Sequence, residues 1–151
     1  MSTKLYLNLF IYSIFRFSFL KINGNIVAPK DPSAWRCEDG NCDQWIHFKS
    51  VDNLSVYGSG IINGQGEKWW EIKHNKKPAA LEISHSNNVR LSDLTFKNNP
   101  RMHVVLSHID TLHVSNITID APGDSPNTDG IHISGCTNVL VENCTIATGK
   151  F

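Results

Sequence analysis

Four segments of the chain share one pattern of apolar and polar positions, which starts at Trp45 and runs nearly to the C-terminus. Apolar and polar residues alternate within each segment, which is typical of strands buried on one face. The apolar positions recur at shared offsets: Ile46, Leu81, Val104 and Ile131; Phe48, Ile83, Leu106 and Ile133; Leu54, Val89, Leu112 and Val139; Val56, Leu91, Val114 and Val141; and Ile61, Phe96, Ile119 and Ile146. We expect all of these side chains to face one core.

The spacing of the segments indicates a repeating fold. They start 35, 23 and 27 residues apart, and turns rich in Asn, Ser, Asp and Gly divide each segment into short strands. A multi-strand unit that recurs without a helical period is typical of a solenoid. The pattern therefore predicts an all-β parallel β-helix, in which equivalent residues of successive coils stack about 4.8 Å apart. An antiparallel sandwich also has many short strands, but it predicts no fixed long period.

Polar residues recur in the turns as well. One turn offset is occupied by Asn53, Asn88, Thr111 and Asn138. Amides stacked there can hydrogen-bond along the column and satisfy backbone groups of the turns. His85 and His108 share another offset and are expected to stack, since a metal site would need further ligands that the sequence does not supply.

The longest interval, between the first two segments, contains an excursion. Its Glu-Lys-Trp-Trp-Glu-Ile-Lys core predicts one or two helical turns between Gly66 and Pro78. Trp69 and Trp70 can stack on sugar rings, but aromatic residues in such a position more often cover exposed core. We therefore favour the covering role.

Composition and charge narrow the classes of function. A chain of 151 residues is enough for one domain, and 40% hydrophobic against 19% charged residues is ordinary for a folded protein. Lys plus Arg and Asp plus Glu number 14 each, so the formal net charge is zero. This balance argues against a nucleic-acid partner, which requires a basic excess. It does not determine the oligomeric state.

Four cysteines are too few for a disulfide scaffold. Cys37 and Cys42 close a small polar loop and can pair, although two free thiols are also compatible with that loop. A zinc site needs a second close pair of Cys or His ligands, and the sequence offers none.

The first 21 residues form an apolar segment that differs from the rest of the chain. Lys4 followed by an apolar run resembles a secretory signal peptide, but no small-residue cleavage site follows. Arg16 interrupts the run before it reaches a membrane-spanning length, so we expect no stable membrane anchor. A misread start is the alternative for this segment. In either case we expect residues 22–151 to form the β-helix domain. Acceptor sequences for glycosylation at Asn53, Asn116 and Asn143 are compatible with secretion.

The densest polar cluster lies between the third and fourth segments, over residues 120–134. Asp120, Asp124 and Asp129 supply three carboxylates, and Asp129 comes two residues before the inward-facing Ile131. Its side chain should therefore lie at the leading edge of a strand. An ordinary Asx-rich turn accounts for the composition equally well, because Asp and Asn side chains often hydrogen-bond their own backbone there.

Several motifs together identify a family resemblance. The motifs Gly-Ile-Ile-Asn-Gly-Gln-Gly-Glu-Lys-Trp-Trp, Asn-Asn-Pro-Arg-Met-His-Val-Val and, above all, Ala-Pro-Gly-Asp-Ser-Pro-Asn-Thr-Asp-Gly-Ile-His-Ile-Ser resemble the plant-type polygalacturonases, over residues 22–149. These pectin-degrading glycoside hydrolases have a right-handed parallel β-helix. The resemblance implies an inverting hydrolysis of α-1,4 bonds between galacturonic acid units, with no metal or organic cofactor, in the cell wall or extracellular space.

The resemblance also suggests roles for individual residues. Asp129 matches the aspartate of the Asn-Thr-Asp motif, a catalytic carboxylate that positions the attacking water, and Asn127 of the same motif helps to shape the site. An inverting glycosidase pairs such a base with a carboxylic acid that protonates the leaving oxygen. His103 and His132 lie near the substrate-binding region of the family and can touch substrate. Polar positions on a solvent-facing strand are the alternative for both histidines.

The sequence also departs from the family pattern. Lys150 and Phe151 stand where the family has two consecutive aspartates, and the chain contains neither Gly-His-Gly nor Arg-x-Lys. We therefore expect the N-terminal part of a secreted polygalacturonase, a β-helix incomplete at its C-terminal end and inactive by itself. The alternative is a non-catalytic β-helix that binds acidic pectin.

Overall fold

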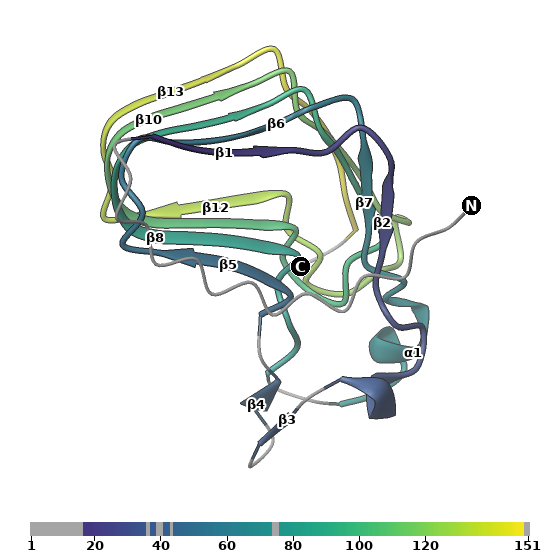
Figure 1. Cartoon of the computed structure of the whole chain (residues 1–151). Helices are drawn as coiled ribbons and strands as arrows, with labels where there is room; N and C mark the ends of the chain where they lie inside the picture. Colours follow the sequence, from purple (N-terminus) through teal and green to yellow (C-terminus); the bar gives the residue numbers. More distant parts are fainter. Residues whose placement is uncertain (1–16, 36, 39–40, 43, 74–75, 150–151) are drawn as a thin grey trace.

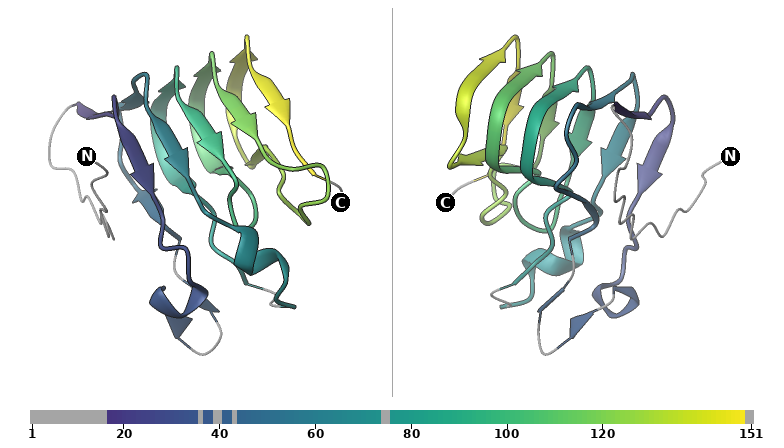
Figure 2. Two further views of the ribbon diagram at one scale, coloured as in Figure 1. Left: turned by 90° about the vertical axis from the view of Figure 1, so that its right-hand side faces the viewer. Right: turned by 60° about the vertical axis from the view of Figure 1, so that its left-hand side comes forward.

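The computed structural model describes residues 17–35, 37–38, 41–42, 44–73 and 76–149. The chain winds into successive coils of a right-handed parallel β-helix, as the periodicity predicts (Figures 1 and 2). Residues 1–16, which hold most of the predicted signal segment, lie outside the described residues. Among the residues described, no helix is long and apolar enough to cross a membrane.

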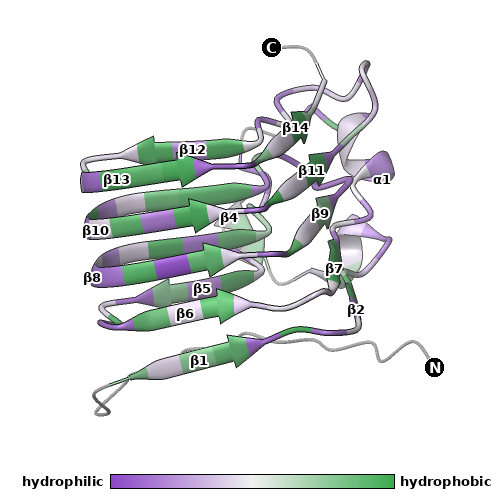
Figure 3. Ribbon diagram, turned by 90° about the horizontal axis from the view of Figure 1, so that it is seen from above, coloured by the Kyte–Doolittle hydropathy of each residue, from purple (hydrophilic) through white to green (hydrophobic). Residues whose placement is uncertain are grey.

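Two faces of the solenoid belong to one seven-stranded sheet, because β8 and β10 each continue from one face to the next. Its strands are β1 (Ser18–Lys21), β5 (Ile46–Lys49), β6 (Leu54–Tyr57), β8 (Leu81–Ser92), β10 (Val104–Ser115), β12 (Ile131–Ser134) and β13 (Thr137–Glu142). The third face is a five-stranded sheet of β2 (Asn25–Val27), β7 (Ile61–Asn63), β9 (Thr95–Lys97), β11 (Thr118–Asp120) and β14 (Thr145–Ala147) (Figure 3). All pairs in both sheets are parallel.

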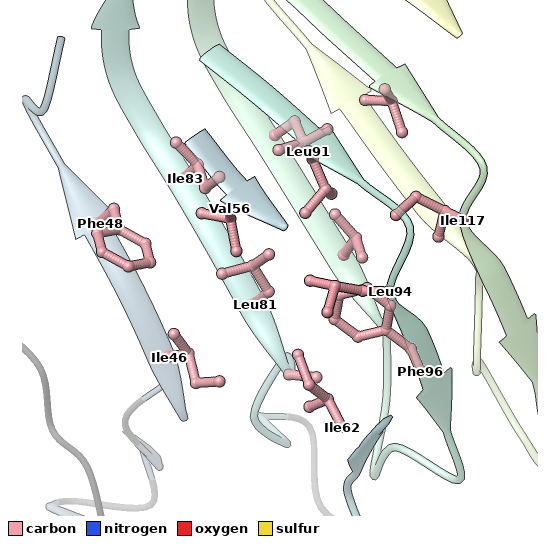
Figure 4. Close-up of a cluster of buried hydrophobic side chains, with 14 of the residues drawn as sticks. Ile46, Phe48, Val56, Ile62, Leu81, Ile83, Leu91, Leu94, Phe96 and Ile117 are labelled. Atoms are coloured by element: carbon pink, nitrogen blue, oxygen red, sulfur yellow. The ribbon is translucent and has the colours of Figure 1, made fainter. Parts of the chain in front are cut away.

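The strand register confirms four of the five predicted apolar columns. Ile46, Leu81, Val104 and Ile131 are successive partners across β5, β8, β10 and β12, and the next three columns follow the same register. Their members in β5, β6, β8 and β10 are buried and form one continuous core (Figure 4). Burial of these stacked columns is the main stabilising contribution, since the hydrophobic effect scales with the apolar area removed from water.

The fifth column was predicted one residue out of register in its first coil. Ile62, and not Ile61, is the partner of Phe96 and lies in the core. The turn through Gly58 has one residue more than the equivalent turns of the later coils, since six positions separate Val56 from Ile62 and five separate Leu91 from Phe96. A shift of one residue turns a strand side chain to the opposite face.

One further coil precedes the four that the sequence repeat predicts. β1 pairs with β6 and β2 pairs with β7, so the described solenoid already begins at Ser18, before the predicted boundary at residue 22. Within residues 17–35, this coil has only these two short strands. It therefore shows less of the repeat pattern in sequence.

The corners between faces are made by residues with left-handed backbone conformation. Asn53, Asn88, Thr111 and Asn138 have φ between 51° and 62°. The Asn88 amide donates to Asn53 Oδ1 over 2.8 Å, as the column of amides predicted, whereas Asn138 reaches Asp110 Oδ1 instead. Thr111 interrupts this column of amides because its side chain has a hydroxyl group and no amide.

The two histidines with a shared offset stack as expected. The rings of His85 and His108 have centroids 4.8 Å apart and planes inclined by 10°. Both have φ of 53°, so they occupy the same corner of adjacent coils. No group of three metal-binding side chains occurs within the described part of the chain.

The excursion between the first two repeat segments lies at one corner of the solenoid, as seen along its axis (Figure 1). It contains α1 (Glu67–Trp70). A second excursion, between β2 and β5, contains a short 3-10 helix, η1 (Pro32–Ala34). Trp69 is 2% exposed and meets Trp35 edge to face at 5.8 Å, which confirms the covering role. An ion pair of 2.7 Å between Lys68 and Asp31 joins the two excursions and holds the pKa of that carboxyl far below its usual range.

The remaining strands form a small hairpin outside the solenoid. β3 (Cys37–Glu38) and β4 (Asn41–Cys42) pair antiparallel, with Cys37 directly opposite Cys42. The two cysteines are joined by a disulfide in the structure, with an S–S distance of 2.10 Å.

Candidate active site

Parallel pairing continues into the turns before β8, β10 and β12, and this sets the position of the polar cluster. The backbone N–H of Ala80 donates to Met102 O, and that of His103 donates to Asp129 O over 3.0 Å. The leading edges of three coils therefore lie side by side, with Asp129 on the last of them. The expectation that Asp129 lies at the edge of a strand agrees with this arrangement.

The loop that carries Asp129 is built around buried hydroxyls. Ser125 Oγ donates to Pro122 O over 2.6 Å and lies 2.6 Å from Thr128 Oγ1. Both residues are buried, although they belong to a turn. Thr128 Oγ1 also accepts a hydrogen bond of 3.3 Å from the backbone N–H of Gly149. An ordinary Asx-rich turn forms hydrogen bonds only within itself. This loop is also bound to Gly149, which lies 21 residues from Thr128 along the chain.

Gly149 can approach this loop because it has no side chain. A Cβ atom at this position would lie 2.1 Å from Ser125 O and 2.8 Å from Pro122 O, both of them backbone atoms. Real Cβ atoms do not come so close, so any larger residue would displace the loop. The end of the β12 coil is thus packed tightly beneath the polar cluster.

His103 anchors the backbone of Asp129 from the preceding coil. Its ring is 0% exposed, and its Nε2 accepts a hydrogen bond of 3.3 Å from the backbone N–H of Asn99. The proton of the neutral ring is therefore on Nδ1, which donates to Asp129 O over 3.2 Å. Burial lowers the pKa of His103, which favours this neutral form.

This geometry corrects the sequence interpretation of His103. A fully buried ring does not reach substrate, and it is not a polar side chain on a solvent-facing strand either. The sequence missed this role because the carbonyl that the ring binds lies 26 residues further along the chain. The polar residues Asn99 and His103 immediately before an apolar strand were the available signal.

Asn99 extends the support one coil further. Its Nδ2 donates to Pro78 O over 3.0 Å and to Met102 O over 2.6 Å, and its side chain is fully buried. Its backbone oxygen accepts from Trp70 Nε1 over 3.1 Å. The excursion, the β8 edge and the β10 edge are therefore connected beneath the loop that carries Asp129.

The other predicted site residues are nearer to solvent. Asp129 itself is half-buried, while Asn127, Asp124 and His132 are exposed. Asn127 has φ of 52°, in the left-handed region that Asn adopts more readily than most residues. His132 follows Ile131 on β12 and pairs with Val105 on the same outer surface. The arrangement offers one partly desolvated carboxylate beside exposed polar groups.

The three acceptor asparagines for glycosylation lie at the corners of the coils. Asn116 and Asn143 are exposed, and the Asn116 amide donates to Asp93 Oδ1 over 3.0 Å. Asn53 is half-buried and accepts the Asn88 amide.

Protonation of His103 should weaken the fold. An unfolded histidine gains its proton near pH 6.5, whereas folded His103 remains neutral to lower pH because burial lowers its pKa. The unfolded chain therefore binds more protons below about pH 6.5, and the free energy of unfolding falls as pH decreases through this window. We expect His103→Gln to lose this part of the pH dependence, worth about 1.4 kcal/mol for each unit of pKa shift.

Urea unfolding at about pH 7.5 and about pH 5.5 measures the effect. His132→Gln is the matched control, because His132 is exposed and its substitution should change the free energy of unfolding little. An unchanged pH dependence in His103→Gln would contradict the buried neutral ring.

Polygalacturonases are among the proteins that this chain resembles in sequence. A probable polygalacturonase from Arabidopsis thaliana is 42% identical over 131 residues, which cover 87% of this chain and 28% of that protein. A polygalacturonase from Juniperus ashei is 38% identical over 144 residues, covering 88% of this chain and 27% of that protein. The chain thus spans less than a third of the length of these relatives.

Solved structures give the same result at the level of the fold. A polygalacturonase from Erwinia carotovora ssp. carotovora superposes with a TM-score of 0.78 at 28% identity, covering 87% of this chain and 42% of that one. The profile of glycosyl hydrolases family 28 matches residues 19–150, nearly the whole described solenoid. On this match, the chain belongs to glycosyl hydrolases family 28, a family of glycosidases.

Proposed function

We propose that this solenoid provides the leading coils of a polygalacturonase, which hydrolyses the α-1,4 bonds of galacturonan with inversion. The observation that carries the proposal is Asp129, a half-buried carboxylate whose backbone is held in place by the buried ring of His103. Asp129 positions the attacking water. Such a step requires a well-positioned carboxylate, since small displacements of a reacting group are costly, and the fixed backbone limits where the Asp129 side chain can reach.

The surroundings of Asp129 support contact with a sugar chain. Asn127 and His132 are exposed on either side of it in sequence, and both can donate hydrogen bonds to sugar hydroxyls. An inverting glycosidase also needs a carboxylic acid roughly 6.5–9.5 Å from the base, to leave room for the water. We propose that this acid comes from a coil that stacks beyond the β12 coil.

The family supports the class of substrate and the compartment. The relatives are named polygalacturonases, so the partner proposed here is the acidic polysaccharide galacturonan. A cell-wall or extracellular location follows from that substrate, since pectin lies outside the cell. The disulfide between Cys37 and Cys42 is compatible with an oxidising compartment.

The 151-residue chain by itself should be inactive. Its sequence has Lys150 and Phe151 after the Ala-Thr-Gly of residues 147–149, and it contains neither Gly-His-Gly nor Arg-x-Lys. Loss of a general acid alone lowers the rate about 10²–10⁴-fold. Substrate binding requires less, because an anionic sugar chain can be held without a proton donor.

Binding and hydrolysis can be measured separately on the same chain. We expect tetragalacturonate to shift the backbone amide signals of residues 127–132 in a heteronuclear NMR titration, while a reducing-end assay on polygalacturonate shows no product. The neutral galactose oligomer of the same length is the control and should cause no shifts. Shifts confined to other faces, or none, would contradict the proposed site, and released reducing ends would contradict the inactivity of the chain.

A further inference from the structure

The edge that carries Asp129 has a second charged group on the neighbouring coil. The Asn99 amide bridges Pro78 O and Met102 O, and the His103 backbone donates to Asp129 O. These hydrogen bonds align the segments before β8, β10 and β12, with neighbouring coils about 4.8 Å apart. Arg101, next to Met102, therefore lies between the Pro78 segment on one side and the Asp129 segment on the other.

Cations gather on this edge without carboxylate partners. Arg101 and Lys76 are exposed, and no ion pair to either occurs in the described part of the chain. Lys77 is half-buried, and its Nζ donates to the carbonyl of Trp69 over 2.5 Å. Desolvation lowers the pKa of Lys77, as expected for an ammonium group that lacks a nearby anion.

The two segments that carry these cations contain no acidic residue to balance their positive charge. Neither residues 76–80 nor residues 98–103 contain Asp or Glu. The carboxylates of Asp124 and Asp129 belong to the following coil, so charge changes from positive to negative along the solenoid axis. A ligand that carries a negative charge on each repeating unit would supply the anions that these cations lack.

We propose that Arg101 binds the carboxylate of the galacturonate unit adjacent to the one over Asp129, so that the polysaccharide runs along the solenoid axis towards the β8 coil. This inference rests on the proposed function and adds to it a contact that selects for uronate. The planar guanidinium group donates two parallel hydrogen bonds to a carboxylate, which suits a planar anion better than a lysine ammonium does. Lys76 and Lys77 strengthen the attraction from the preceding coil.

The test compares binding of tetragalacturonate to the wild-type chain, Arg101→Gln and Arg101→Lys by isothermal calorimetry. We expect Arg101→Gln to weaken the affinity about 10-fold or more, since charge-assisted hydrogen bonds are the strong ones, and Arg101→Lys to fall between the two. Arg90→Gln is the matched control: Arg90 is exposed on β8, where it pairs in register with Ser55 and His113 on another face. It removes the same charge and should bind as the wild type does.

The outcomes separate this inference from the proposed function. Equal affinities of the wild type and Arg101→Gln, with amide shifts still at residues 127–132, would overturn the role of Arg101 and leave the proposed site intact. Equal losses of affinity in Arg101→Gln and Arg90→Gln would show that the effect comes from the change in net charge. This result would overturn the specific contact of Arg101. Absence of binding by the folded wild-type chain would overturn both proposals.

Discussion

Asp129→Asn should lower the rate of galacturonan hydrolysis by about 10²–10⁴-fold in a chimaera that continues from Gly149 into the C-terminal coils of the Arabidopsis relative. Asn has nearly the same shape as Asp, so the hydrogen bonds that the ring and the backbone N–H of His103 donate to the carbonyl of residue 129 should persist. The amide cannot accept the proton that water loses during attack. The loss is therefore expected in kcat, measured from initial rates of reducing-end release, with little change in KM.

Asp124→Asn is the matched control for this experiment. Asp124 lies in the same loop, but its carboxylate is exposed and outside the buried support. We expect its substitution to change the rate by only a few fold. Equal losses in the two variants would contradict a special role for Asp129. A folded chimaera that binds tetragalacturonate but remains inactive would favour the alternative, a β-helix that only binds pectin.

Phe96→Ala should lower the free energy of unfolding by about 3–5 kcal/mol. Phe96 is 0% exposed on β9 and pairs in register with Ile62 and Ile119 of the neighbouring coils. Removal of the ring leaves a cavity between two stacked residues that the strand spacing prevents from closing. Each coil is stabilised mainly by its neighbours, so the loss should extend beyond the substituted coil. Urea unfolding followed by circular dichroism measures it.

Phe19→Ala provides the comparison with the same side chain removed. Phe19 also lies on a solenoid strand, β1, but it is 68% exposed. Its substitution should cost little, because most of the ring is already in water. Similar losses for the two variants would mean that the column through Phe96 does not form the core.

The repeat pattern predicted the core because each side chain's place depends on local alternation. Four apolar columns follow directly from positions such as Leu81 and Val104, whose inward direction is set by the strand period. The fifth column failed at Ile61 because the extra residue in the Gly58 turn has no effect on the apolar pattern on either side of it. Only the hydrogen-bonded register shows that the extra residue belongs to the turn and that Ile62 is the residue facing the core.

The site divides in the same way. The Asn-Thr-Asp motif and its place before an inward Ile131 were sufficient to put Asp129 at a strand edge, since both depend on neighbouring residues. The burial of His103, its neutral ring and its hydrogen bond to the Asp129 carbonyl were decided by the tertiary structure. The physical reason is that stacking of coils brings together backbone groups far apart in sequence, and the partner of a polar side chain is known only when that register is known.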